Sequence, residues 1–337
     1  MPGTVYAGIV AYNSMDDLPA CLSALEQQTH PHLHITILDN ASADGAVDWL
    51  ATNAPQVRCI ASEENVGFGR GHNTIIKACN LQPDDYYMAL NPDALLEPAY
   101  IAALVAALDE HGAGWGTGHL CLSADDGTRT DLTYSIGHGM LHNGNAFNIG
   151  SGLHYAHMPD EPYEVFGAPG AAAIYCGKMI RDISVDGDLF DPTLFLYYED
   201  VDVDWRAQAH GWRCISVPGA VAWHRGSSPH GELLMHAVAN RYAVAVKNMP
   251  LPGLLCFIFP RMALNVLART VIQGQQGRWL FKQLRRVVPG MWARRRLTRQ
   301  MPLRHWIRWS DSQPTTQPRN FIQRWHKFRA AQARTER

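Results

Sequence analysis

An alternation of short apolar runs with helical patterns over the first 110 residues restricts the fold of this chain more than any other feature. The apolar runs show little polar alternation, as in parallel strands that are covered on both faces. They lie at residues 5–12, 34–38, 57–61 and 86–90. Between them, a Ser14–Asp17 capping box predicts one helix start, and further helices are expected near 71–79 and 98–108. This order predicts a doubly wound α/β sheet.

Polar clusters follow directly on the predicted strands or on their short extensions. They lie at residues 12–13, 39–40, 65–73 and 91–93. Ligands of such sheets bind outside the carboxyl ends of the strands, so we expect these clusters to converge on one crevice. From about residue 112 to 170 the pattern loosens, which predicts short antiparallel strands and a flap.

Charge is distributed very unevenly along the 337 residues. Residues 1–240 carry 9 Lys/Arg and 29 Asp/Glu, a formal charge of −20, whereas residues 241–337 carry 20 Lys/Arg and 2 Asp/Glu, a charge of +18. This split predicts two units with different roles and a boundary near residue 240, which we draw as one unit over 1–250 and a basic helical module with aromatic residues over 251–337. Seven cysteines without a CxxC pair indicate reduced thiols, and the start of the sequence shows no secretory signal, so we expect a cytoplasmic protein.

Three of the strand-end clusters have both a chemical and a structural interpretation. Asp39 suits a hydrogen bond from a pyrimidine imide or a ribose hydroxyl, or it forms a simple Asx turn. The glycines around Arg70 allow close backbone approach to a phosphate or base, or they only form a turn. The sequence Asn91-Pro92-Asp93 suits a hard cation such as Mg²⁺ or Mn²⁺, but it is also a common turn.

Residues 197–206 (YYEDVDVDWR) place four acids within six residues of an aromatic stretch. Asp200 is expected as a helix N-cap that stays ionised and acts as a general base, and Gly211 as the helix end. An Asp202–Arg206 pair on the same helix would be structural. Farther along, His224 would ligate a metal through a neutral imidazole, or it is a structural histidine.

Taken together, these segments resemble the inverting GT-A glycosyltransferases of family 2, in particular the bacterial rhamnosyltransferase-like branch. The matching segments are 10–13 (VAYN), 38–42 (LDNAS), 65–73 (NVGFGRGHN), 90–93 (LNPD), 170–172 (GAA), 198–202 (YEDVD) with 205–206 (WR) and 211–212 (GW), 224–227 (HRGS), and 240–242 (NRY) with 247–248 (KN). The resemblance covers about residues 5–250 and implies a GT-A fold, a mostly parallel sheet flanked by helices.

The resemblance implies a role for each matching position. Asp200 stands at the catalytic base, and Asp93 and His224 stand at the positions that bind Mg²⁺ or Mn²⁺. The expected contacts of the nucleotide-diphosphate donor are Tyr12, Asn13, Asp39, Asn65, Gly67, Arg70, Asn73, Asn91, Trp205 and Arg206. Asn91 replaces the first acid of the D-x-D metal motif, which leaves one carboxylate there. We expect inverting transfer of rhamnose or a related deoxysugar from a dTDP- or UDP-sugar to an acceptor hydroxyl of a glycan or lipid-linked substrate, in cell-envelope or other glycan synthesis.

The basic C-terminal segment mixes arginine and tryptophan beside an apolar stretch at 254–272, which Pro260, Arg261 and Arg269 interrupt. It suits an anionic membrane surface, a nucleic acid, or docking on the acidic part of the chain. We favour peripheral attachment to the inner face of the cell membrane and expect no nucleic acid.

Two other functions stay open on the sequence. A sugar-nucleotide nucleotidyltransferase would use a similar sheet, but it would carry a Gly-rich basic loop after the first strand, where this chain has Tyr12-Asn13-Ser14. A non-catalytic nucleotide-binding scaffold would not need the set Asp93, Asp200 and His224.

Overall fold

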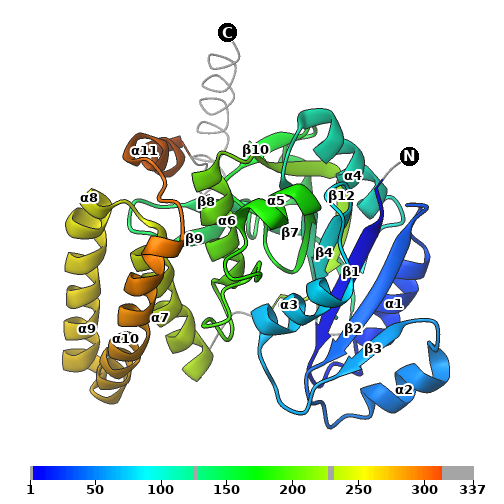
Figure 1. The fold of residues 1–337 in the computed structure, drawn as a ribbon, viewed down its shortest axis with the longest axis horizontal. Coiled ribbons are helices and arrows are strands. Elements are labelled where there is room, and N and C mark those ends of the chain that lie inside the picture. Colours follow the sequence, from blue (N-terminus) through cyan, green and yellow to red (C-terminus); the bar gives the residue numbers. More distant parts are fainter. Residues whose placement is uncertain (1–2, 125–126, 227–230, 313–337) are drawn as a thin grey trace.

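The computed structural model describes residues 3–124, 127–226 and 231–312 and confirms the predicted alternation of strands and helices (Figure 1). The four predicted strands form β1 to β4, and the expected helices form α1, α3 and α4, with a further helix, α2, before β3. Their bounds are β1 Val5–Ala11, α1 Leu18–Glu26, β2 Leu33–Asp39, α2 Ala46–Asn53, β3 Arg58–Ala61, α3 Phe68–Ala78, β4 Tyr86–Leu90 and α4 Tyr100–His111.

The remaining elements include the antiparallel additions predicted for 112–170. They are β5 Ala94–Leu96, β6 Trp115–Ser123, β7 Arg129–Ser135, β8 His138–Met140, β9 Ala146–Asn148, a 3₁₀ turn Tyr155–His157, β10 Tyr163–Val165, β11 Ala172–Cys176, α5 Gly177–Ile183, α6 Glu199–His210, β12 Cys214–His224, α7 Gly231–Asn248, α8 Leu251–Gly253, a π-helical turn Leu254–Ile258, α9 Phe259–Gln273, α10 Gln275–Arg294, a 3₁₀ turn Arg295–Leu297 and α11 Leu303–Ser312.

Within the described residues the central sheet has ten strands, with the order β10-β12-β6-β11-β4-β1-β2-β3, while β5 pairs with β12 and β7 with β6. Strands β3, β2, β1 and β4 are parallel, and Ala11 of β1 lies beside Asp39 of β2. Strand β11 runs antiparallel between β4 and β6, and β6 is parallel to β12. The carboxyl ends of β1, β2 and β4 therefore meet at one edge, as the sequence predicted.

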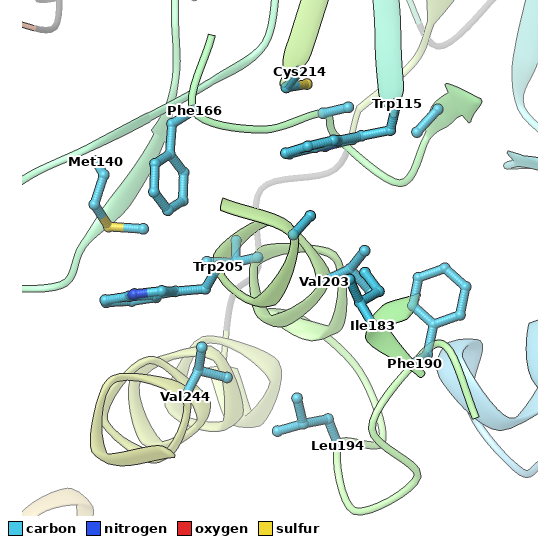
Figure 2. Close-up of a cluster of buried hydrophobic side chains, with 14 of the residues drawn as sticks. Trp115, Met140, Phe166, Ile183, Phe190, Leu194, Val203, Trp205, Cys214 and Val244 are labelled. Atoms are coloured by element: carbon cyan, nitrogen blue, oxygen red, sulfur yellow. The ribbon is translucent and has the colours of Figure 1, made fainter. Parts of the chain in front are cut away.

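Helices cover both faces of this sheet and create two hydrophobic cores. The first core contains the buried faces of α1, α2 and α4. The second contains α5, α6 and α7 together with buried residues of α10 and α11. In Figure 2, apolar side chains surround α6, among them Phe166, Val244 of α7 and Trp115 of β6.

The C-terminal helices α9 and α10 lie beside α7, at the left of Figure 1, and residues of α10 and α11 share the hydrophobic core that contains α6 and α7. Helices α9 and α10 form a hairpin next to α7, and Trp306 of α11 is fully buried in the core that contains α6. The division at residue 250 stays a prediction. Residues 313–337 of the basic module lie outside the described residues.

Helical residues Leu251–Ile272 form a stretch that is long and apolar enough to cross a membrane by length and composition, with a mean hydropathy of 1.6. Only 17% of its most apolar window is buried inside the protein, within the described part of the chain. The apolar stretch at 254–272, although Pro260, Arg261 and Arg269 interrupt it, therefore lies within a single weak candidate for a membrane span among the described residues.

Two predicted helix starts are wrong in detail. The Ser14 hydroxyl donates to the Tyr12 carbonyl, and no side chain caps α1, so the capping box does not form. Helix α6 begins at Glu199 with Tyr198 as N-cap, because Tyr197 and Tyr198 both adopt positive φ values of 69° and 73° that turn the chain into the helix. Asp200 thus lies in the first turn, and Gly211 ends the helix at φ 89° as predicted.

Candidate active site

Asp39, at the end of β2, is almost fully buried at the edge where the strands meet. Its Oδ2 accepts a hydrogen bond from the Ser42 amide at 3.1 Å. Its Oδ1 is buried without a hydrogen-bond partner among the described residues. A buried carboxylate oxygen without a partner is costly, and an imide N–H or a hydroxyl of a ligand would satisfy it.

Loops after β1, β2 and β3 are tied to one another around Asp39. The Asn13 amide donates to Ser42 Oγ at 3.0 Å, and Asn13 Oδ1 accepts from the Ala43 amide at 2.9 Å. Asn40 Nδ2 donates to Asn65 Oδ1 at 2.9 Å. Tyr12 is 51% exposed beside them and is available for stacking on a base. Asn13 and Asn65 thus shape the loops through hydrogen bonds of their own.

The glycine-rich segment before α3 packs tightly against the loop that leads to α6. Gly67 has φ 81°, and a Cβ atom there would overlap the Phe195 carbonyl. Asn73 is buried and pairs with the backbone of Phe190 in both directions, at 2.8 and 3.0 Å. Arg70 Nε donates to the Pro192 carbonyl at 2.8 Å. These three residues, predicted as donor contacts, therefore anchor the loop around residues 190–195.

Asp93 and His224 come together from β-strand ends that are 131 residues apart in sequence. His224 Nε2 lies 3.2 Å from Asp93 Oδ1 and 3.1 Å from Asn91 Nδ2. Burial opposes ionisation of Asp93, but the hydrogen bond and charge of His224 outweigh it and lower the pKa of Asp93. Arg225, the next residue, pairs with Asp17, whereas Ser227 of the same motif lies outside the described residues.

These two side chains fit a divalent cation as part of its ligand set. His224 Nε2 and the Asp93 carboxylate face the same space, and a neutral imidazole with its proton on Nδ1 would offer its Nε2 lone pair to a cation there, in place of the contact with Asn91 Nδ2. Among the described residues no group of three or more His, Cys, Asp or Glu side chains could hold a metal ion. Mg²⁺ is usually held by one or two protein carboxylates with waters and phosphate oxygens completing its shell, so a two-residue site is consistent with a diphosphate ligand.

Asp200 lies at the N-terminal end of α6 with its side chain 23% exposed. Its Oδ2 accepts from the Gly170 amide at 3.0 Å, and its Oδ1 from the Val201 amide at 2.8 Å. The adjacent Glu199 is buried, and burial together with the charge of Asp200 raises the pKa of Glu199 to about 8. At neutral pH the first turn therefore carries one accessible carboxylate, Asp200, beside a protonated Glu199.

A short path of hydrogen bonds connects Asp200 with the Asp93–His224 pair. Gly170 donates to Asp200, and the next residue, Ala171, accepts through its carbonyl from the Asn91 amide at 2.9 Å. Tyr134 packs its ring on His224 with centroids 4.6 Å apart. Burial raises the pKa of Tyr134 to about 12, and the charges of Asp200 and Asp93 add to this rise. The base candidate and the metal candidate thus share one polar region.

Trp205 and Arg206 lie away from this region, inside the core. Trp205 is fully buried and stacks on Trp306 with centroids 5.0 Å apart and 6° between the planes. Arg206 Nε donates to Asp202 at 2.9 Å, and its Nη1 donates to the Ile183 carbonyl at 2.6 Å. Neither side chain has a surface for a nucleotide, so we interpret both as structural residues of α6 in place of the donor contacts expected from the sequence.

The sequence assigned no role to His138, which contacts the α6 acids, or to Asn240, which contacts the turn before α6. His138 of β8 lies between Asp200 and Asp204, in the irregular region that the sequence described only as a flap. A histidine between two glycines, Gly137 and Gly139, was the available signal. Asn240 of α7, in the 240–242 segment, donates to the carbonyls of Leu196 and Tyr197 and so supports the positive-φ turn before α6.

Comparison with known proteins gives matches in sequence and in fold. The sequence model of Glycosyl transferase family 2 matches residues 6–183. Two proteins of Mycobacterium tuberculosis, from strains CDC 1551 / Oshkosh and ATCC 25618 / H37Rv, are each 25% identical over 249 residues, which are 67% of this chain and 79% of each relative. Both are named N-acetylglucosaminyl-diphospho-decaprenol L-rhamnosyltransferase.

Among solved structures, the crystal structure of GalNAc-T7 with UDP, GalNAc and Mn²⁺ superposes with a TM-score of 0.56 at 14% sequence identity. The alignment covers 73% of this chain and 48% of that one, so this chain spans about half of its length. At that identity the likeness concerns the fold, which is of the GT-A type.

Proposed function

The chain belongs to glycosyl transferase family 2 and is a glycosyltransferase, and we propose that it transfers a sugar with inversion from a nucleotide-diphosphate sugar to an acceptor hydroxyl, with Asp200 as the base. The observation that carries this proposal is the position of Asp200. It is an accessible carboxylate in the first turn of α6. Backbone hydrogen bonds of Gly170 and Ala171 connect it with Asn91, which lies beside the Asp93–His224 pair.

In this mechanism Asp200 removes the proton of the acceptor hydroxyl as the acceptor oxygen attacks the anomeric carbon. The attack comes from the face opposite the diphosphate, so the new glycosidic C–O bond forms as the bond to the diphosphate oxygen breaks. The bonding electrons leave with the nucleoside diphosphate, and the anomeric configuration inverts. The Gly170 amide donates to Asp200 Oδ2 and so orients the carboxylate that would receive the proton.

Asp93 and His224 would hold a Mg²⁺ or Mn²⁺ ion, which would neutralise the negative charge of the diphosphate leaving group. Asn91 lies beside this site, and its Nδ2 would move away from His224 Nε2 when that nitrogen binds the ion. The lowered pKa of Asp93 keeps its carboxylate ionised at neutral pH, as a metal ligand requires.

Asp39 and Tyr12 would bind the donor nucleotide, Asp39 through its unpartnered Oδ1 and Tyr12 through its exposed ring. Asn13, Asn65, Gly67, Arg70 and Asn73 would shape this donor site through the loops that they fix. The relatives' names speak of L-rhamnosyl transfer, and on that basis we propose rhamnose or a related deoxysugar from a dTDP- or UDP-sugar.

For the acceptor we propose a glycan or lipid-linked substrate in cell-envelope glycan synthesis, reached from the cytoplasmic side of the membrane. The names of the relatives describe a decaprenol-linked acceptor. In this chain, α9 exposes Leu264, Leu267 and Val271 by 65%, 61% and 77% on one face of the helix. An apolar groove of about 760 Å³ is lined by residues of α9 and α10, Arg285 among them.

Apolar side chains beside arginines are the chemistry of a surface that binds an anionic bilayer. We therefore propose that the α9–α10 hairpin attaches the enzyme to a membrane that holds its acceptor. The basic helices also contact the acidic part of the chain, through the ion pair of Arg294 with Asp191. This contact does not use the exposed face of α9.

A thermal-shift screen of nucleotide sugars with and without Mn²⁺ tests the donor and the metal. A cognate donor should raise the melting temperature, and Mn²⁺ should raise it further. Asp93→Asn and His224→Ala should remove the Mn²⁺-dependent part, while His154→Ala, a change at an exposed histidine, should not. Equal Mn²⁺ effects in all four proteins would rule out this metal site.

Asp200→Asn tests the base directly. It should abolish sugar transfer and leave donor binding intact, because the amide keeps the shape of the side chain but cannot take a proton. Turnover near that of the wild type would show that Asp200 is not the base. A protein that binds the donor but neither transfers nor hydrolyses it with any acceptor would instead be a nucleotide-binding scaffold, and pyrophosphate-dependent nucleotide exchange would indicate a nucleotidyltransferase.

A further inference from the structure

His138 of β8 lies between two carboxylates of α6 that are four residues apart and therefore share one helix face. Its Nδ1 lies 2.7 Å from Asp204 Oδ2, a hydrogen bond, and its Nε2 lies 3.9 Å from Asp200 Oδ2. The histidine side chain is only 7% exposed, and Asp204 is fully buried. The three side chains thus form a row from the interior of the protein to the base candidate.

Asp204 is fixed on the inner end of this row. Its Oδ1 accepts from the Trp115 indole at 2.9 Å and from the Ala168 amide at 3.1 Å. Gly167 packs so closely that a Cβ atom there would overlap the Asp204 carboxyl group. Trp115 and Ala168 therefore hold Oδ1 of this carboxylate, and His138 contacts Oδ2.

His138 is fixed as well. Its amide donates to the Gly167 carbonyl at 2.7 Å, and its carbonyl accepts from the Phe166 amide at 3.1 Å. Because Asp204 Oδ2 accepts a hydrogen bond from His138 Nδ1, the neutral imidazole carries its proton on Nδ1. The free lone pair of Nε2 then faces Asp200.

The electrostatic surroundings favour proton uptake by this imidazole. Burial alone would lower the pKa of His138, but the hydrogen bond to Asp204 and the charge of Asp200 raise it above the ordinary 6.5. Burial raises the pKa of Asp204 to about 6, so this carboxyl is ionised near neutral pH.

The other titratable groups near His138 are few. Tyr175 of β11 is buried, and burial together with the charges of Asp204 and Asp200 raises its pKa. Helix α11 packs against β8 and carries Arg304, His305 and Arg308, while β9, the strand paired with β8, has no titratable side chain. Among the described residues, Asp200 and Asp204 are the charges that act on His138 in the balance of its pKa.

We propose that His138, oriented by Asp204, takes over the proton that Asp200 removes from the acceptor hydroxyl. This step rests on the proposed role of Asp200. The O–H bond of the acceptor breaks as Asp200 gains the proton, and the Asp200 O–H bond then breaks as an N–H bond forms at His138 Nε2. Asp200 is again a carboxylate, and the imidazolium is balanced by Asp204 until the proton leaves to water after product release.

The step explains why a buried ion-pairing histidine stands behind a carboxylate base. An aspartate holds a proton weakly, so a proton left on Asp200 would readily return to the acceptor oxygen. Imidazole holds it more firmly, and the gap of 3.9 Å closes by a small rotation of the partly exposed Asp200 or through one water. His138 acts through Asp200 and is in this sense a positioning residue.

The pH profile of kcat tests the proposal, because the step needs His138 with an unprotonated Nε2. Wild-type activity should fall as the pH drops through the pKa of His138, which lies above 6.5. In His138→Gln, kcat should fall by about 10²-fold or more, and the remaining activity should persist to lower pH. His210→Gln is the matched control, since His210 pairs with Asp182 on the surface near the other end of α6 and should leave both quantities unchanged.

Asp204→Asn is the second variant, and it preserves the size of the side chain. Its Oδ1 still accepts from Trp115 and Ala168, but its amide nitrogen cannot accept from His138 Nδ1, so the imidazole carries its proton on Nε2 and cannot receive one from Asp200. In a catalytic triad the equivalent change leaves the geometry intact and lowers kcat by about 10⁴-fold. We expect a loss of kcat with unchanged donor affinity and melting behaviour close to wild type.

If both variants kept the kcat and the pH profile of the wild type, the proposal would be overturned. A loss of kcat in His138→Gln without a shift of the acidic limb of its pH profile would also overturn it, because that result indicates a structural role alone. If neither variant folds, a wild-type acidic limb below pH 5 overturns it and a limb above 6.5 supports it. Asp200→Asn separates this step from the proposed function: an active Asp200→Asn enzyme contradicts the base itself, whereas an inactive one beside a fully active His138→Gln contradicts only the relay.

Discussion

Lys247 of α7 donates to Asp202 of α6 at 2.7 Å, and neither side chain is more than 1% exposed. The same ammonium donates to Asp191 at 2.7 Å, and Arg294 of α10 reaches Asp191 at 2.8 Å. Asn248 Nδ2 completes the cluster with a bond to Asp202 at 2.7 Å. The helix that carries Asp200 is therefore joined to α7 and α10 by buried charges, so its position depends on the C-terminal helices.

Lys247→Met should lower the free energy of unfolding by about 3–5 kcal/mol, because it leaves two buried carboxylates without their shared cation. Urea titration at pH 7, followed by circular dichroism, measures this change. Lys77→Met is the control, since Lys77 is 59% exposed in its pair with Asp188 and should cost at most about 1 kcal/mol. Equal losses in the two variants would contradict the importance of the buried cluster.

The cost of Lys247→Met should also depend on pH. Burial would raise the pKa of Asp191 and of Asp202, but the charge of Lys247, helped by Thr193 at Asp191 and by Arg206 at Asp202, outweighs it and lowers both below their ordinary value of 3.8. Their contribution is therefore present above that value and is lost as the pH falls toward the folded pKa values. The difference in unfolding free energy between wild type and Lys247→Met should stay the same from pH 7 to about pH 5 and shrink between about pH 5 and pH 2. A difference that stayed constant over this range would contradict the assignment.

Strands β1, β2 and β4 could be predicted from sequence because each is a short apolar run that ends in polar residues. The same logic predicted that Asp39 and Asn91–Asp93 would meet at one edge, and the structure brings His224 to Asp93. Trp205 could not be placed, because a helical pattern does not show that α6 is buried on all sides. Its burial depends on α7 and α11, which follow much later in the chain.

His138 escaped prediction for a related reason. Its function depends on Asp204, 66 residues away, and on a strand of only three residues whose position is set by tertiary contacts. The basic composition of residues 251–337 correctly suggested helices with a separate chemical character. It did not reveal that Trp306 would complete the core around α6, since charge says little about the few apolar residues that become buried.

Trp306→Ala tests whether residues 1–250 form an independent unit. The indole stacks on Trp205 and is fully buried, so its removal should lower the free energy of unfolding by about 3–5 kcal/mol. Trp292→Ala, at a tryptophan that is 48% exposed, should cost much less. A chain ending at residue 250 should then be poorly folded, as judged by its melting transition and solubility. A cooperative melt of that chain at the wild-type temperature would support the predicted boundary instead.

Asp39→Asn should weaken binding of the nucleotide sugar. The oxygen of the new amide would accept from the Ser42 amide, and its NH₂ group would face the nucleotide where a hydrogen-bond acceptor is needed. If Asp39 Oδ1 binds an imide N–H or a hydroxyl, the loss should be about 1–3 kcal/mol, or roughly 5- to 150-fold in Kd. Calorimetric titration with UDP and dTDP measures it. Asp48→Asn, on the exposed side of α2, is the control and should bind as the wild type does. Unchanged affinity in Asp39→Asn would remove Asp39 from the donor site.

Membrane attachment should depend on the exposed face of α9. Replacing Leu264, Leu267 and Val271 together by Ser removes the apolar side chains that would enter a bilayer, each worth about 1.5–3 kcal/mol when fully buried. Sedimentation with vesicles of phosphatidylglycerol should fall at least about tenfold for this variant. Val47→Ser with Leu132→Ser changes exposed apolar residues elsewhere and should sediment as the wild type does.

Added salt should weaken binding of the wild type through the arginines, and neutral phosphatidylcholine vesicles should bind less. Equal sedimentation of the α9 variant and the wild type would exclude this face as the membrane contact, whatever the charge of the lipid.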